Sequence, residues 1–176
     1  IGSAALQPIL QRFHETSTSS PIVLARYLET ALQGPKISTL VRDALYRDVG
    51  AGQAGRSEAL TQIALLCAPR RSPAGVRSVI TYNYDDLVEK HLEESSVAFH
   101  TITNGGHQND IEKLSIYHAH GFLPRPGTDE DLGDVVLSEG SYHALYLNPY
   151  HWANIVQLNA LTDSTCLFVG HSMTDP

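Results

Sequence analysis

The stretch VRSVITYNYDDLVE, at residues 76–89, decides how the fold of this chain is interpreted. Its first half holds three β-branched residues, Val76, Val79 and Ile80, which form a short apolar run and predict a buried strand. A polar turn at residues 81–83 ends this run. The first half therefore predicts a strand whose carboxyl end carries polar side chains.

The second half of the stretch predicts a helix. Leu87, Val88 and Leu92 are spaced to lie on one face of a helix. Asp85 and Asp86 are expected in its first turn, where carboxylates favour the helix dipole and can cap free amides. A strand, a polar turn and a helix N-terminus is the arrangement with which α/β sheets present ligand-binding groups. An ordinary strand–helix junction capped by aspartate remains the alternative.

The composition is that of an ordinary globular domain. The 176 residues are 42% hydrophobic and 18% charged, and the formal net charge is −7. A chain of this length makes one domain that buries roughly 68–70% of its unfolded surface. No apolar run approaches the ~20 residues of a membrane span, so no membrane partner is expected. The largest basic cluster is Arg70-Arg71, which argues against nucleic acid as a partner of this segment.

The two cysteines, Cys67 and Cys166, lie 99 positions apart among apolar neighbours. This spacing excludes a CxxC metal site, and we expect two buried thiols in a reducing compartment, the cytoplasm. The chain has no initiator methionine and no secretory signal, and it stops at Asp175-Pro176. We therefore expect a fragment of a longer protein. That protein could form a homo-oligomer through regions that lie partly outside this chain.

Residues 1–68 are expected to be helical. Ser20-Pro21 favours a helix start, because serine is a good N-cap and proline suits the first turn, and Gly34-Pro35 predicts a stop. Apolar residues recur at helical spacing in four segments, at residues 4–13, 22–32, 37–45 and 59–67. Stripes of this kind predict core packing rather than a functional site.

One glycine-rich segment, GAGQAG at residues 50–55, matches the dinucleotide-binding pattern G-x-G-x-x-G. That pattern binds phosphate only where a hydrophobic strand precedes it. Here the preceding residues 42–48 are charged and helical in character. We therefore expect a flexible connection between two helices rather than a phosphate loop.

From residue 76 onward, strand patterns alternate with helix patterns. Further strands are expected at residues 97–102, 114–117, 135–137 and 166–169. Helices are expected to begin at Ser138-Glu139 and at Pro149, the second with apolar residues filling its faces. This alternation predicts an α/β fold, in which helices flank a parallel sheet and the helical segment lies at the N-terminal side.

Polar residues stand where three of these strands are expected to end. They are Thr81-Tyr82-Asn83, His118 and His120 with Gly121, and Gly170-His171-Ser172. Parallel strands end at the same edge of a sheet, so these groups are expected to converge over one crevice. His120 is a candidate general base, because histidine titrates near neutral pH and the following glycine lets a ligand approach closely. A hydrogen-bonded structural histidine remains the alternative.

His118 and His120 are two positions apart, as on one face of a strand, and this spacing would allow both to bind a metal. No third ligand stands nearby, since Asp129 and Asp131 lie in a loop rich in proline, glycine and aspartate. Zinc sites need three or four placed ligands, so no metal is expected. We expect His118 to be structural, and its replacement by alanine to change activity by less than about tenfold.

The polar strand ends resemble the motifs of one family. Thr81-Tyr82-Asn83-Tyr84-Asp85 resembles the T-x-N-x-D core of the sirtuins, and more closely the TNYD form of their bacterial sirtuin-like relatives. His120-Gly121 resembles the HG motif of that family. Residues 138–154 resemble the helical stretch that follows this motif, and residues 168–175 resemble the element G-x-S-x-x-D. The resemblance extends over about residues 76–176, with the motifs in the family's order.

This resemblance implies a Rossmann-like domain that binds NAD⁺ and breaks its nicotinamide–ribose bond. Asn83 would position the nicotinamide ribose and the attacking water, and Asp85 would hold the carboxamide. His120 would be the general base. Further residues that would contact NAD are Thr81, Gly121, Gly170 and Ser172, the last two at the adenosine-side ribose or the phosphates.

Two departures from the family shape this expectation. The opening strand of the family, with its Gly-Ala-Gly-x-Ser phosphate loop, is not found in this sequence, nor is the C-terminal end. We therefore expect residues 1–176 to be a fragment of one sirtuin-like domain, with a helical portion at residues 1–68 and a Rossmann-like portion at residues 76–176. These residues alone are expected to bind NAD⁺ much more weakly than the longer protein.

The four zinc-binding cysteines of the protein-deacetylating sirtuins are absent as well. Their absence favours an NAD⁺ hydrolase without zinc, of the kind often associated with bacterial antiviral defence. A protein deacylase or ADP-ribosyltransferase is the alternative enzyme, and a sensor that binds NAD or ADP-ribose is the alternative without catalysis. The presence of both Asn83 and His120 favours an enzyme, because a sensor needs neither a base nor an amide that orients water.

Overall fold

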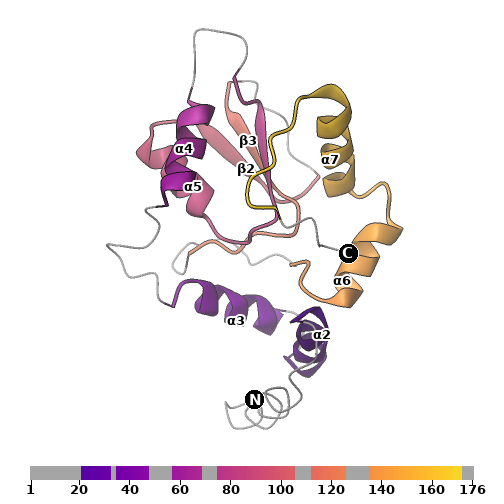
Figure 1. Cartoon of the computed structure of the whole chain (residues 1–176). Helices are drawn as coiled ribbons and strands as arrows, with labels where there is room; N and C mark the ends of the chain where they lie inside the picture. Colours follow the sequence, from indigo (N-terminus) through magenta and orange to yellow (C-terminus); the bar gives the residue numbers. More distant parts are fainter. Residues whose placement is uncertain are drawn as a thin grey trace.

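The computed structural model describes residues 21–32, 35–47, 57–68, 75–105, 112–125 and 135–171. Within these ranges the chain forms three strands and six helices (Figure 1). The expected first helix at residues 4–13 and the glycine-rich segment at residues 50–55 lie outside the described residues.

The three strands form one parallel sheet. β1 (Ser78–Thr81), β2 (Phe99–Ile102) and β3 (Leu114–His118) lie in the order β1-β3-β2. Residues 114–116 of the central strand are buried, because β3 has a neighbour at each edge and is covered on its faces. The parallel sheet that the alternating pattern predicted is confirmed.

Two helices and the sheet enclose the main core. α4 (Glu58–Cys67) packs against α5 (Leu87–Glu94), and Figure 1 shows both on one side of the sheet, with α7 (Trp152–Asp163) on the other. The buried members of this core come from α4, from α5, from the connection between α5 and β2, and from β3, and they are Ala64, Cys67, Leu92, Val97, Leu114 and Ile116. Removing apolar surface from water stabilises a fold by about 25 cal/mol for each Å² buried, so this cluster contributes to the stability of the fold.

The remaining helices form a second layer. α2 (Pro21–Leu32) contacts α3 (Pro35–Leu45) and α6 (Glu139–Leu147). The predicted starts of α2 and α6 are confirmed, and Ser138 forms a capping box with Ser141 at the start of α6. The apolar stripes predicted at residues 22–32, 37–45 and 59–67 correspond to α2, α3 and α4.

Two of the expected strands are wrong. Residues 135–137 form no strand and bond to a loop instead, since the Val136 amide donates to the carbonyl of His120 at 2.8 Å. Residues 166–169 form no strand, and Leu167, Phe168 and Val169 are 75%, 55% and 55% exposed. An apolar run becomes a buried strand only where another strand pairs with it, and none does in the described residues. Cys166 is correspondingly exposed, whereas Cys67 is buried as expected.

The last helix differs from its prediction. α7 begins at Trp152 rather than at Pro149, because residues 148–151 form a turn and the imidazole of His151 accepts from the Ala153 amide at 3.3 Å. Its apolar side chains do not fill a core, since Ile155, Leu158 and Leu161 are exposed and Ala153 is buried.

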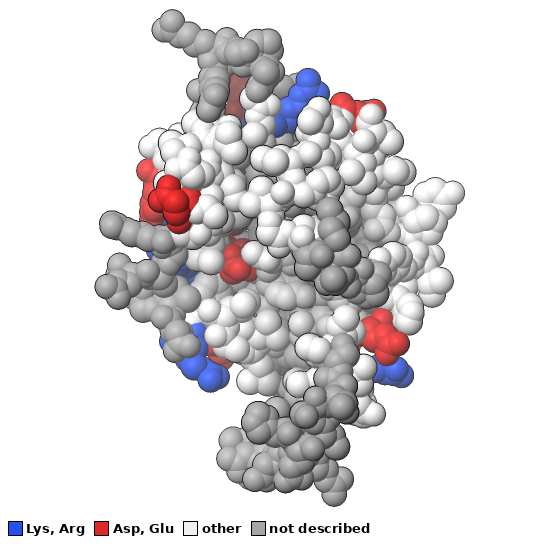
Figure 2. All heavy atoms as spheres, in the orientation of Figure 1, with Lys and Arg blue, Asp and Glu red and all other residues white. Residues whose placement is uncertain are grey.

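The basic side chains on one face of the molecule are scattered. On the face in Figure 2, Lys and Arg side chains stand apart from one another rather than in a basic patch. Each helix in the described ranges is too short or too polar to cross a bilayer.

Candidate functional site

The loops that follow β1 and β3 lie side by side. Thr81 and His118 are register partners at the ends of these strands, and two residues further along come Asn83 and His120. The Ala119 amide donates to the carbonyl of Thr81 at 3.0 Å, so the pairing continues beyond the sheet. A 2.7 Å hydrogen bond from the Leu123 amide to the carbonyl of Tyr84 joins the loops further out. Two of the three polar strand ends therefore converge as the sequence predicted.

Asn83 has a fixed main chain and an exposed side chain. Its amide donates to the hydroxyl of Thr81 at 3.1 Å, and its carbonyl accepts from Nδ1 of His118 at 3.0 Å. Within the described residues no hydrogen bond holds its side-chain amide. An asparagine side chain both donates and accepts, so this amide is suited to hold a hydroxyl or a water.

The imidazole of His120 lies in an aromatic environment and is 6% exposed. Its ring centroid lies 4.7 Å from that of Tyr82 and 5.2 Å from that of Tyr142, which meets it edge to face. Gly121 follows with a φ of +103°, a conformation that glycine adopts without strain. Tyr82, which directly precedes Asn83 in the sequence, thus packs against the ring of the candidate base.

The acidic pair precedes α5 instead of lying in its first turn. Asp85 accepts from the Leu87 amide at 3.1 Å and so caps the helix, while the side chain of Asp86 makes no capping bond. Asp86 instead accepts from Nε of Arg125 at 3.0 and 3.1 Å. Burial raises the pKa of Asp85, the nearby Asp86 raises it further, and the bond from Leu87 opposes the shift.

His118 and His120 do not form a metal-binding pair. β3 ends at His118, and its fully buried ring contacts Phe122 at 4.3 Å, whereas His120 lies in the turn beyond and contacts Tyr82. In the part of the chain that the structure describes, no three His, Cys, Asp or Glu side chains form a group that could hold a metal ion. The absence of zinc stays a prediction.

The third polar segment, Gly170-His171-Ser172, follows no strand in the described residues and is itself described in part. Gly170 has a φ of +66°, and the His171 ring meets the ring of Tyr82 edge to face at 5.3 Å. The C-terminal segment thereby reaches the same aromatic environment as His120. Ser172 lies outside the described residues.

Sequence reasoning missed a buried polar network beneath Asn83. Glu89 of α5 is buried, and its Oε1 contacts Nε2 of His118 at 2.8 Å and accepts from the hydroxyl of Thr101 at 3.0 Å. A signal for it was present, because Glu89 precedes the core residue Leu92 by three positions and so shares its helical face.

A second missed contact joins Tyr46, the residue after α3, to both loops. The Tyr46 hydroxyl donates to the carbonyl of Leu123 at 3.0 Å and accepts from the Asp86 amide at 3.0 Å. The Arg125 guanidinium lies over the Tyr46 ring, 5.7 Å from its centroid. No spacing in the sequence predicts this contact, since residues 46 and 123 are 77 positions apart.

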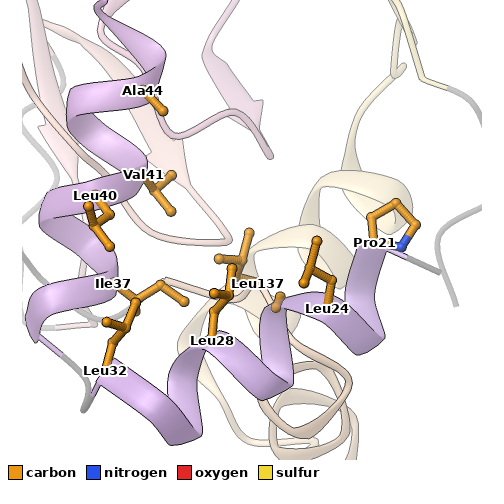
Figure 3. Close-up of a pocket in the computed structure, with 10 residues that line it drawn as sticks. Pro21, Leu24, Leu28, Leu32, Ile37, Leu40, Val41, Ala44 and Leu137 are labelled. Carbon is orange, nitrogen blue, oxygen red and sulfur yellow. The ribbon is translucent and has the colours of Figure 1, made fainter. Parts of the chain in front are cut away.

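A pocket of about 310 Å³ lies between α2 and α3 and is drawn in Figure 3. Its lining is apolar and comes from these two helices and from Leu137. It contains none of the site residues that the sequence indicated, so the chemistry is not expected there.

One of two comparisons with known proteins found a relationship. A comparison with curated proteins gave no match. A comparison with protein families matches residues 77–176 to the SIR2-like domain. The matching range starts just before β1 and contains both converging loops, the sheet, α6 and α7. Because it covers more than half of the 176 residues, and the residues that resemble its T-x-N-x-D and HG motifs lie together at one edge of a parallel sheet, the chain belongs to the SIR2-like domain family.

Proposed function

We propose that the full-length protein cleaves NAD⁺ into nicotinamide and an ADP-ribose product. SIR2-like domains use NAD. The observation that carries the proposal is that Asn83 and His120 occupy matching positions in neighbouring loops. Asn83 lies two residues after Thr81 and His120 two residues after His118, and Thr81 and His118 are register partners on adjacent parallel strands. One substrate can therefore meet an orienting amide and a base at the same sheet edge.

The reaction chiefly requires orientation. Breaking the nicotinamide bond builds positive charge on the ribose, and nicotinamide leaves as a neutral molecule that needs no proton. Asn83 is proposed to hold a ribose hydroxyl and the attacking water, which its exposed amide and hydrogen-bonded main chain support. Asp85 is proposed to hold the carboxamide, with Thr81 and Gly121 beside it and Gly170 and Ser172 toward the adenosine.

His120 is proposed to remove the proton as the new bond to ribose forms. Its ring is 6% exposed between two tyrosine rings, so bulk water has little access to it. A positioned base contributes typically about 10²–10⁴-fold to the rate. His120→Ala is therefore expected to lower nicotinamide release by about 10² or more, and so is Asn83→Ala.

Release of free nicotinamide from NAD⁺ by the full-length protein tests the proposal. The matched controls are Asn159→Ala and His143→Ala, which change exposed residues of α7 and α6 and are expected to keep wild-type rates. Circular dichroism confirms that each variant is folded. Wild-type rates in folded His120→Ala would refute its assignment as the base.

Two further arms separate the alternatives. Nicotinamide release that requires an acylated peptide, or that labels a protein with ADP-ribose, would identify a deacylase or a transferase. Binding of NAD⁺ by calorimetry without any nicotinamide release would identify a sensor. Release without an acceptor is the result that hydrolysis predicts.

The setting of bacterial antiviral defence belongs to this proposal and rests on the resemblance to sirtuin-like enzymes. Phage-infected bacteria that produce the wild-type protein are expected to lose NAD⁺, while cells with the Asn83→Ala variant keep it. Equal NAD⁺ levels in the two cultures would refute the role in antiviral defence and would leave the proposed cleavage of NAD⁺ unaffected.

A further inference from the structure

The main chain of Asn83 is bound by a histidine that has no contact with solvent. His118 is 0% exposed, and its Nδ1 lies 3.0 Å from the carbonyl oxygen of Asn83. Its Nε2 lies 2.8 Å from Oε1 of Glu89, which is 6% exposed and belongs to α5. Thr101 of β2 donates to the same carboxyl oxygen at 3.0 Å.

The hydrogen-bonding capacities of these groups determine where one proton lies. A main-chain carbonyl can only accept, so Nδ1 of His118 carries a hydrogen and donates to Asn83. The short contact on the other side holds one more proton, either on Nε2 or on the Glu89 carboxyl. In both cases the ring cannot rotate or change its tautomer without losing a bond, so the donor toward Asn83 is fixed.

Packing alone does not account for this arrangement. Oε2 of Glu89 is buried and makes no hydrogen bond within the described residues. A buried carboxyl group with an unsatisfied oxygen costs free energy, and apolar residues in place of a buried ion pair are often at least as stable. What this costly arrangement provides is a rigid hydrogen-bond donor, Nδ1 of His118, directed at the main-chain carbonyl of Asn83.

The geometry points to His118 and Glu89 as a positioning pair that fixes the main chain of Asn83 and so presents its side-chain amide to the substrate. This inference rests on the proposed function, in which Asn83 orients the ribose and the water. From the sequence we expected a substitution at His118 to change activity by less than about tenfold, and this inference predicts a larger loss. Neither residue is assigned contact with the substrate.

The decisive variant replaces the pair with apolar residues of similar size, His118→Leu/Glu89→Leu, in the full-length protein. We expect it to fold and to lower kcat for nicotinamide release by about tenfold to 10²-fold, because small misplacements of an orienting group have effects of this size. The KM for NAD⁺ is expected to change by less than about threefold. A folded double variant with wild-type kcat would overturn the inference.

The conservative variant His118→Asn retains an amide donor for the Asn83 carbonyl and is expected to keep kcat within about threefold of wild type. A loss as large as that of the double variant would contradict the role of the Nδ1 donor. Ile116→Val, on the same strand and also 0% exposed, is the packing control and is expected to keep wild-type kcat. If the double variant does not fold, Glu89→Gln and Glu89→Ala decide, since only the glutamine offers Nε2 a partner and equal kcat would refute the pair.

An arm without turnover separates this inference from the proposed function. If the wild-type protein releases no nicotinamide, the proposed function fails, and NMR order parameters of the Asn83 main chain then test the pair. A rigid backbone gives values of about 0.85, and we expect the double variant alone to fall toward about 0.6 at Asn83. An unchanged value at Asn83 would show that the pair does not fix it.

Discussion

Replacing Tyr46 by phenylalanine removes one oxygen atom and two hydrogen bonds that connect the turn after α3 to the site loops. The hydroxyl donates to the carbonyl of Leu123 and accepts from the amide of Asp86, both at 3.0 Å. Leu123 follows His120-Gly121, and Asp86 follows Asn83, so the loss loosens both loops together. The ring itself stays, and with it the contact with Arg125.

The size of the effect follows from the two groups that lose their partner. A polar group left unsatisfied in the interior costs about 1–3 kcal/mol. Both bonds are partly buried, so the lower end applies to each, and we expect the free energy of unfolding to fall by about 2 kcal/mol. With a denaturant slope near 2 kcal/mol per molar urea, the midpoint falls by about 1 M.

Urea unfolding followed by circular dichroism measures this change. Tyr146→Phe is the matched control, because Tyr146 is 62% exposed, and its effect is expected to stay within about 0.5 kcal/mol. If the free energy of unfolding of folded Tyr46→Phe also falls by about 0.5 kcal/mol or less, the two hydrogen bonds of Tyr46 do not stabilise the protein as proposed.

The pH dependence gives a second check on Tyr46. Burial is the main reason that its pKa is raised above the ordinary value. The unfolded chain then releases the proton more readily than the folded one, so the wild-type protein loses this stability as the pH rises above about 10. The difference in stability between wild type and Tyr46→Phe is therefore expected to narrow there.

Three further predictions concern titration, reactivity and metal. Burial raises the pKa of Asp85, so folding favours its neutral form, and the stability gained from binding this proton is lost as the pH rises through the folded pKa. Denaturant unfolding is therefore expected to show that Asp85→Asn is more stable than wild type at pH ~7 and equal to it below about pH 4. Burial likewise raises the pKa of Cys67, and Cys166 is exposed, so alkylation followed by mass spectrometry is expected to label Cys166 first, and the reverse order would contradict the structure. Elemental analysis of purified protein is expected to find no stoichiometric zinc, and stoichiometric zinc would remove that prediction.

Local patterns in the sequence predicted the secondary structure well where one element suffices. Serine followed by a glutamate predicted the start of α6, and proline predicted the start of α2, because capping depends on neighbouring residues alone. The same locality explains the error at α7, where a turn and the imidazole of His151 cap the helix after Pro149.

Patterns that depend on a partner were less informative. Residues 166–169 have the composition of a buried strand, yet Leu167 is 75% exposed, since no strand in the described residues pairs with the segment. Residues 135–137 are held by a loop bond to His120 and by the Tyr84 hydroxyl on the carbonyl of Val136 at 2.6 Å. A strand is a property of a pair of segments, which one segment cannot reveal.

The site divides in the same way between sequence and tertiary structure. From the sequence we predicted that polar groups at the ends of β1 and β3 meet, because parallel strands end at one edge, and we named Asn83 and His120 as candidates. The surroundings of these two residues become visible once the chain is folded: Tyr82 and Tyr142 lie at the ring of His120, His118 and Glu89 lie beneath Asn83, and Tyr46 contacts both loops. These contacts join residues 22 to 77 positions apart, and such distances leave no periodic trace in a sequence, because they arise only when separate elements pack together.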